Sequence, residues 1–208
     1  MKTEFNPSRR DFLRTGAALG AWHMGLALAA GAPNESGFQI GCYTRPWDKH
    51  DYRVALDGIA RAGYRYAGLM TAKCETWVLI TVNSTPDAVA AIAEDVKQRG
   101  LKTLSLYGGD FPVARSIEAG MAGLKTLINH CVVCDCPNLL LGGTGDAKLV
   151  KDYYKVVAEC CDYAAAKGVG MSIKPHGGQN ATGAQCRKII EQVGHPNFRL
   201  WYDPGNIY

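Results

Sequence analysis

Three side chains that could do chemistry follow two short apolar runs near the end of the 208-residue chain. Lys174 and His176 stand in "SIKPHGG", and Asp203 stands in "RLWYDPGN". An ammonium, an imidazole and a carboxylate suit three kinds of site: a metal site, a site of amine chemistry, or an ion pair at the ends of two packed strands. Which of these forms depends on the elements that position the three side chains.

Strand-like and helix-like patterns alternate along the chain after residue 37. Six apolar runs predict strands at 38–43, 64–70, 101–109, 138–143, 169–175 and 197–203. Amphipathic patterns predict helices at 51–63, 85–100, 113–134, 147–167 and 182–194. Alternation with short connections is typical of a parallel α/β protein, which closes either as a doubly wound sheet or as a (β/α)8 barrel.

The motifs favour the barrel over the doubly wound sheet. The first strand is not followed by a G-x-G-x-x-G fingerprint, and the sequence contains no P-loop motif. The repeat is roughly 30–35 residues long and polar residues follow every strand, as in a barrel. A barrel takes eight units and about 250 residues. Residues 37–208 supply six units, so the sequence predicts a partial (β/α)8 barrel that is incomplete at its carboxyl-terminal end.

The amino terminus carries an export pattern. Arg9 and Arg10 precede Phe12 and a run rich in Gly and Ala, which is short for a membrane span. This pattern is similar to a twin-arginine signal peptide, predicted over residues 1–32. It predicts a periplasmic or otherwise exported protein that meets the membrane only through this signal. Residues 1–29 carry four Lys and Arg against two Asp and Glu, so the formal net charge falls from +4 to +2 without them. So small a charge argues against a nucleic-acid partner.

Eight cysteines raise the question of disulfides in an exported chain. Most of them lie on the apolar faces of predicted helices, where a cysteine packs as a small hydrophobic side chain. Cys131, Cys134 and Cys136 stand closer together and supply three thiols, whereas a structural zinc site takes four ligands. A metal cluster, a disulfide and plain packing remain open for these three cysteines.

The strand order, with "SIKPHGG" and "WYDPGN", resembles the xylose isomerase-like TIM-barrel family. That family holds sugar (phosphate) isomerases and epimerases, inosose dehydratases and endonuclease IV. The resemblance covers residues 38–208, which is the first part of a family barrel. It implies a divalent metal (Mn, Mg, Co or Zn) at the carboxyl-terminal mouth of the barrel. It also implies a small-molecule sugar or sugar phosphate as substrate, with isomerisation or epimerisation through an enediolate.

The site residues that the resemblance implies depart from the family pattern at one position. Asp203 takes the place of the metal-binding aspartate on the sixth strand, and His176 matches the histidine of an E-x-H motif. Lys174 takes the place of the glutamate ligand, although an ammonium repels a divalent ion. Four roles stay open for Lys174: an acid beside a metal held by His176 and Asp203, a cation that pairs with Asp203 and replaces the metal, a Schiff-base nucleophile, or a lysine that only reaches solvent.

Further candidates follow other strands. Trp47 and His50 stand in "RPWDKHD" after the first strand, where Trp47 could stack on a sugar ring or only pack against the protein. Asn206 could bind a substrate hydroxyl or belong to an ordinary Pro-Gly turn. The loop "GGTGD", at 142–146, suits a phosphate or a carboxylate, or is a turn in which Asp146 caps the next helix.

The sequence therefore predicts a sugar (phosphate) isomerase or epimerase that uses a metal. The alternative is a non-catalytic, exported carbohydrate-binding barrel in which Lys174 replaces the catalytic glutamate. An endonuclease IV-like protein fits less well, because it needs many histidines and a basic groove. Since a partial barrel exposes apolar sheet edges, we expect homo-oligomers and little activity from residues 37–208 alone.

Overall fold

The computed structural model describes residues 38–206. The export signal predicted over residues 1–32 lies outside the described residues, so export and a periplasmic location remain predictions. Among residues 38–206, the structure contains no helix with the length and apolar character needed to cross a membrane.

Six parallel strands form one sheet in which the spatial order follows the chain order. They are β1 (Gly41–Tyr43), β2 (Tyr66–Leu69), β3 (Lys102–Tyr107), β4 (Asn138–Leu141), β5 (Gly170–Ile173) and β6 (Phe198–Leu200). A doubly wound sheet reverses its strand order partway, and this sheet does not. The prediction of a barrel-type α/β fold with six units is therefore confirmed.

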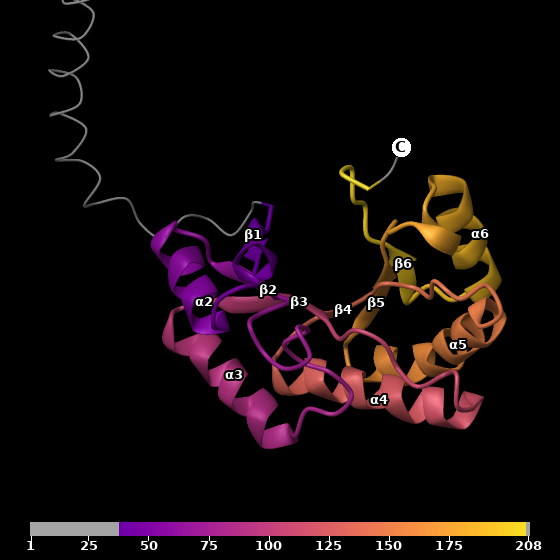
Figure 1. Ribbon diagram of the computed structural model, residues 1–208, viewed down its shortest axis with the longest axis horizontal. Coiled ribbons are helices and arrows are strands. Elements are labelled where there is room, and N and C mark those ends of the chain that lie inside the picture. Colours follow the sequence, from indigo (N-terminus) through magenta and orange to yellow (C-terminus); the bar gives the residue numbers. More distant parts are fainter. Residues whose placement is uncertain (1–37, 207–208) are drawn as a thin grey trace, which may run out of the picture. The chain divides into compact units, whose positions relative to one another are not determined.

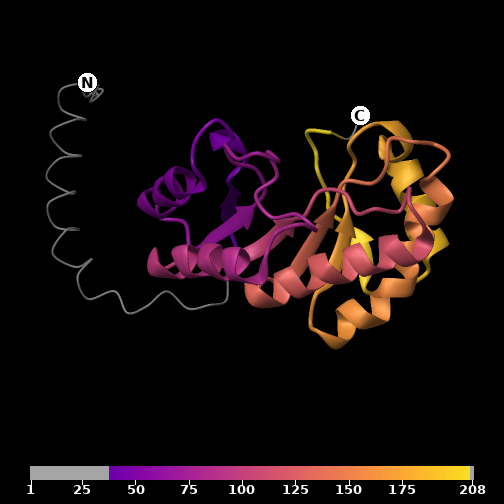
Figure 2. The same cartoon turned by 60° about the horizontal axis from the view of Figure 1, so that its bottom comes forward.

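The helices lie on one side of the sheet. They are α2 (Tyr52–Arg61), α3 (Pro86–Gln98), α4 (Ile117–Val133), α5 (Val150–Ala166) and α6 (Gly183–Val193), with short 3₁₀ helices η2 (Arg45–Trp47) and η3 (Gly178–Asn180) in the loops. Figure 1 shows the strands following an arc with the helices on its outer side. Figure 2 shows α3 and α4 lying across that outer face. Among residues 38–206, no α-helix covers the inner face of the arc.

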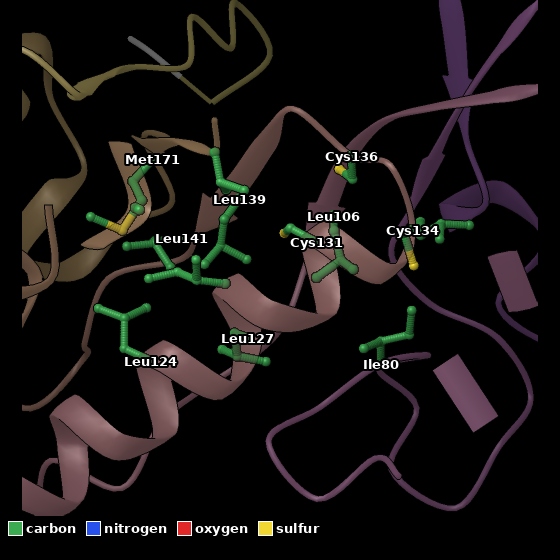
Figure 3. Packing of buried hydrophobic residues seen from close by; sticks show 14 of the residues in the cluster. Ile80, Leu106, Leu124, Leu127, Cys131, Cys134, Cys136, Leu139, Leu141 and Met171 are labelled. Atoms are coloured by element: carbon green, nitrogen blue, oxygen red, sulfur yellow. The ribbon is translucent and has the colours of Figure 1, made fainter. Parts of the chain in front are cut away.

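Side-chain alternation along the strands separates an apolar outer face from a more polar inner face. Figure 3 shows outer-face residues such as Leu139 and Leu141 packed over Leu124 and Leu127 of α4, all of them buried. The inner face is mixed and carries polar side chains. The side-chain amide of Asn138 donates hydrogen bonds to the hydroxyls of two serines on the neighbouring strands, Ser105 and Ser172, over 3.1 and 3.0 Å.

Strands β1 and β6 are the two edges of the sheet within residues 38–206. Large apolar side chains beside these edges are exposed. Ile40 is 66% exposed next to β1, and Leu200 and Tyr202 at β6 are 38% and 67% exposed. The expectation that the partial barrel exposes apolar sheet edges agrees with these values. The homo-oligomer expected from it remains a prediction.

Several predicted boundaries were wrong by a few residues. Helix α4 begins at Ile117 instead of residue 113, because the side chain of Ser116 caps it by accepting a hydrogen bond from Ala119 N. The strands are also shorter than predicted. Asp146 does not cap α5. Its side chain accepts a hydrogen bond from Lys148 N at 2.9 Å, within the loop.

The cysteine cluster belongs to the hydrophobic core. Cys131, Cys134 and Cys136 are buried free thiols, and Figure 3 shows them beside Leu106 and Ile80. Burial raises the pKa of the Cys134 thiol to about 12, which makes its reactive thiolate scarce. Nowhere in residues 38–206 do three or more metal-binding side chains gather, so packing is the role that the structure shows for these cysteines.

We predict that Gly68→Ala destabilises the fold. A Cβ atom at Gly68 would lie 2.3 Å from a ring carbon of Tyr43, the residue paired with it on β1. Overpacking of this kind costs about 1–3 kcal/mol of unfolding free energy. Urea denaturation followed by circular dichroism measures the change. Gly145→Ala is the matched control, because a Cβ there would have no atom within 4 Å. Equal stability of the two variants would contradict the packing described here.

Candidate functional site

Residues at the carboxyl-terminal ends of β1, β5 and β6 line a pocket of about 360 Å³. We call it the Lys174 pocket. Its lining residues are Tyr43, Arg45, Met70, Leu140, Lys174, Trp201, Tyr202, Asp203 and Pro204. A larger hollow of about 460 Å³ opens between α3 and α4, near the amino-terminal end of β3. Barrel enzymes place their sites at the opposite, carboxyl-terminal end, so the Lys174 pocket is the candidate site.

Strand pairing brings Lys174 and Asp203 together. Lys174 directly follows β5, and the hydrogen bond from Trp201 N to Ile173 O, 2.8 Å long, carries the pairing with β6 past the end of that strand. As a result, Nζ of Lys174 lies 3.8 Å from Oδ2 of Asp203. The Lys174 side chain is only 11% exposed. The structure thus contains the ion pair that was one of the four roles left open for Lys174.

The carboxylate of Asp203 is held in place by the turn that follows it. Gly205 N donates a hydrogen bond to Oδ1 over 3.1 Å, and the side-chain amide of Asn206 donates one to Oδ2 over 2.6 Å. Asn206 therefore orients the predicted site aspartate. Its predicted contact with substrate remains a prediction.

His176 lines a second pocket, which we call the glycine-loop pocket, of about 240 Å³. Its lining residues are Tyr107, Asp110, Gly142, Gly143, Thr144, Gly145, His176, Gly177, Gly178 and Asn180. The structure therefore separates His176 from the pocket of Lys174 and Asp203. Buried Asn180 joins the two loops, because its side-chain amide donates hydrogen bonds to the carbonyls of Gly142 and Lys174 over 3.1 and 2.6 Å.

The two pockets are nevertheless coupled by charge. Burial lowers the pKa of His176, and the neighbouring ammonium of Lys174 lowers it further, while the carboxylate of Asp203 opposes them. A guanidinium, that of Arg45, also lowers this pKa. His176 is thus favoured in its neutral form, in which a ring nitrogen can accept a proton.

Trp47 and His50 line neither pocket. The indole of Trp47 packs on α2, where a Cβ atom at Gly58 would lie 3.0 Å from it. His50 is exposed, and its carbonyl accepts a hydrogen bond from Lys73 N. Packing against the protein was the alternative left open for Trp47. The substrate-binding roles of both residues remain predictions.

The sequence analysis missed the aromatic wall of the Lys174 pocket. Tyr43 and Trp201 meet edge to face, with ring centroids 6.0 Å apart, and Tyr202 lines the same pocket. Burial raises the pKa of the Tyr43 hydroxyl. Residues two apart on a strand share a face, so the spacing of Trp201 and Asp203 was a usable signal. Tyr43 carried no such signal, because its position depends on the curvature of the sheet.

Comparison with models of known families shows to which family this chain belongs. The model of the "Xylose isomerase-like TIM barrel" family matches residues 56–208. The chain belongs to this family. The resemblance expected from "SIKPHGG" and "WYDPGN" is thereby confirmed. Among curated proteins, none matches the sequence.

Several solved structures share the fold with this chain at low sequence identity. A D-psicose 3-epimerase determined in the presence of D-fructose is 13% identical, with a TM-score of 0.60, over 79% of this chain and 63% of that one. A probable 3-DHS dehydratase, AsbF from Bacillus anthracis, is 11% identical, with a TM-score of 0.62, over 82% and 64%. The IOLI protein with a bound zinc atom is 16% identical, with a TM-score of 0.57, over 77% and 62%. The chain thus spans less than two thirds of the length of these proteins.

The described residues do not fit the metal that the family implies. Within residues 38–206, no three His, Cys, Asp or Glu side chains come together. Asp203 is the one carboxylate that lines the Lys174 pocket, its oxygens already accept two hydrogen bonds, and His176 lines the other pocket. The ammonium of Lys174 would repel a divalent cation beside Asp203. A metal here would need ligands from outside the described residues, so we derive no chemical step through one.

We predict that Lys174→Met raises the pKa of His176. Removing the ammonium removes a charge that disfavours the protonated imidazole, while burial continues to hold the pKa below its ordinary value. The titration of the His176 ring protons, followed by NMR, measures the shift. Lys102→Met, at the amino-terminal start of β3, is the control. A pKa of His176 that is unchanged in Lys174→Met would contradict the proximity of the two residues.

We also predict that Lys174→Glu increases the affinity for Mn²⁺, by about tenfold or more, since it replaces a repelling charge beside Asp203 with a carboxylate ligand. Electron paramagnetic resonance of added Mn²⁺ measures the bound fraction. Lys102→Glu adds the same charge away from the pocket and serves as the control. Equal binding by the two variants would show that Lys174 does not lie at a metal-ligand position.

Proposed function

We propose that this protein is a sugar isomerase or epimerase that moves a proton between neighbouring carbons of a small sugar in the Lys174 pocket. One observation carries the proposal. A largely buried lysine, Lys174, lies 3.8 Å from Asp203 in a pocket of about 360 Å³ with aromatic walls, at the end of the sheet where barrel enzymes act. A base and a cation side by side are the groups that enediolate chemistry requires.

The proposed reaction uses both members of the pair. The carboxylate of Asp203 takes the proton from the carbon beside the substrate carbonyl, and the electron pair of that C–H bond forms the enediolate. The ammonium of Lys174 stabilises the negative charge that develops on the carbonyl oxygen. Asp203 then returns the proton to the former carbonyl carbon, while the hydroxyl proton of the first carbon moves to the former carbonyl oxygen, which isomerises the sugar. Delivery of a proton by water to the opposite face of the first carbon epimerises it instead. Lys174 thus takes the role that the sequence analysis assigned to a metal.

The aromatic wall fits this substrate class. Tyr43, Trp201 and Tyr202 offer apolar ring faces to the C–H groups of a sugar, beside the polar pair of Lys174 and Asp203. The family relationship and the D-psicose 3-epimerase with D-fructose support the same class. Because the fold also supports a dehydratase, fold alone does not select the reaction.

A second candidate function is that of a non-catalytic carbohydrate-binding barrel. Both oxygens of Asp203 already accept hydrogen bonds, from Gly205 and from Asn206, and this weakens the carboxylate as a base. In that case Lys174 and the aromatic rings would bind a sugar without converting it.

We further propose that the active protein has a closed rim around the Lys174 pocket. Strands β1 and β6 are unpaired on their outer sides within the described residues, and the exposed side chains of Leu200 and Tyr202 lie at one of these edges. Two additional strands that join β1 and β6 would bury these edges and complete a family barrel.

We predict that Lys174→Met and Asp203→Asn each lower the rate of proton exchange by about 10²- to 10³-fold, since each removes a group that acts only in the transition state. The measurement is NMR of deuterium incorporation from D₂O into D-fructose and D-psicose. Lys102→Met, exposed at the start of β3, is the matched control and is expected to exchange at the original rate.

The same experiment separates the two candidates. Sugar binding without any proton exchange, in a protein whose rim is closed by two further strands, would favour the carbohydrate-binding barrel. Exchange that survives in both Lys174→Met and Asp203→Asn would contradict the proposed reaction.

A further inference from the structure

Arg45 lines the Lys174 pocket, yet the proposed reaction does not use it. It stands in η2, in the loop after β1. One terminal nitrogen, Nη1, donates a hydrogen bond to Oδ2 of Asp48 over 2.7 Å. Within residues 38–206 the guanidinium makes no other hydrogen bond. Several of its N–H donors are therefore available to a ligand in the pocket.

Trp77, in the loop after β2, contacts both Arg45 and its partner Asp48. The guanidinium carbon lies 4.4 Å from the centroid of the Trp77 ring, and Nε1 of Trp77 donates to the same Oδ2 of Asp48 over 3.3 Å. Trp77 has a φ of 58°, in the left-handed region that bulky residues rarely adopt. Backbone strain of this kind persists where the surroundings impose it, often at functional sites. Arg45 is thus ordered before any ligand binds.

The second cation of the pocket also lacks a close partner. Nζ of Lys174 lies 3.8 Å from Asp203, beyond hydrogen-bond distance, and no other group among the described residues accepts a hydrogen bond from it. The carboxylate of Asp203 is already satisfied by the turn that follows it. A nearly buried ammonium without a hydrogen-bond acceptor is costly, so an acceptor from a ligand would stabilise it.

We infer that Arg45 is a specificity-determining residue that binds an anionic group, a carboxylate or a phosphate, on the sugar. The planar guanidinium matches the paired oxygens of either group, and the ring of Trp77 and the carboxylate of Asp48 hold it in position. Lys174 adds a second positive charge within the same pocket. This inference rests on the proposed function, because it names the substrate class of the same pocket.

The test is isothermal titration calorimetry of the full chain with three probes: fructose, fructose 6-phosphate and glucuronate. We expect the charged sugars to bind about tenfold more tightly than fructose. Arg45→Gln is expected to remove most of that preference. Arg187→Gln is the matched control, because Arg187 also pairs with a carboxylate, that of Glu191 at 2.8 Å, but on the exposed surface of α6. It is expected to bind all three probes like the original chain.

Trp77→Leu tests the positioning of Arg45. The readout is the ratio of the affinities for charged and neutral sugars, because a purely structural defect lowers both affinities alike. We expect Trp77→Leu to lower this ratio and Trp77→Phe, which keeps an aromatic ring under the guanidinium, to restore part of it. Circular dichroism checks that every variant is folded.

Each outcome of these measurements either supports or overturns the inferred role of Arg45. Preference for fructose 6-phosphate alone assigns a phosphate, and preference for glucuronate alone assigns a carboxylate. Equal affinity for the three sugars, a preference that survives in Arg45→Gln, or no binding of charged sugars to the folded chain at millimolar concentration would overturn it. Charged sugars that bind through Arg45 without proton exchange would overturn the proposed function and leave this inference standing. Exchange on charged sugars at a rate that Arg45→Gln leaves unchanged would overturn this inference and leave the proposed function standing.

Discussion

The parallel pairing of β5 with β6 is the constraint on which the candidate site depends. Met171 pairs with Phe198 and Ile173 with Leu200, so the two strands end at the same edge of the sheet. This register places Lys174 beside Asp203. A shift of one residue would turn Asp203 toward the helices and leave the ammonium without a nearby carboxylate. The buried outer face opposes such a shift, because it would expose Phe198.

The inner face of the sheet shows why a polar pocket forms above an apolar core. Within the described residues, α-helices cover the outer face of the sheet, so outward side chains such as Leu139 are apolar, while inward ones include hydroxyl, amide and charged groups beside aromatic rings. Asn138 bridges two serines there, which satisfies polar groups that water reaches poorly. Lys174 continues this polar face two residues beyond Ser172. The ammonium is tolerated because the pocket stays open beside it.

The ammonium of Lys174 affects what the pocket can bind. Two cations, Lys174 and Arg45, and one carboxylate, Asp203, line the pocket, and Arg45 pairs with Asp48 beside it. Such a lining attracts anions and repels divalent metal ions. The same ammonium also lowers the pKa of His176 in the neighbouring pocket, so the charge of Lys174 affects both pockets.

The sequence by itself determined the barrel-type fold, the six units and the pair of strand ends that meet, because hydrophobic periodicity and turn residues are local signals. It also identified Lys174, His176 and Asp203 as candidate site residues. Only the tertiary structure decided that His176 lines a different pocket from the other two, and that Trp47 packs on α2 while Trp77 reaches Arg45. Loop conformation caused these differences, since the φ of Trp77 and the hydrogen bonds of Asn180 depend on residues distant in the chain.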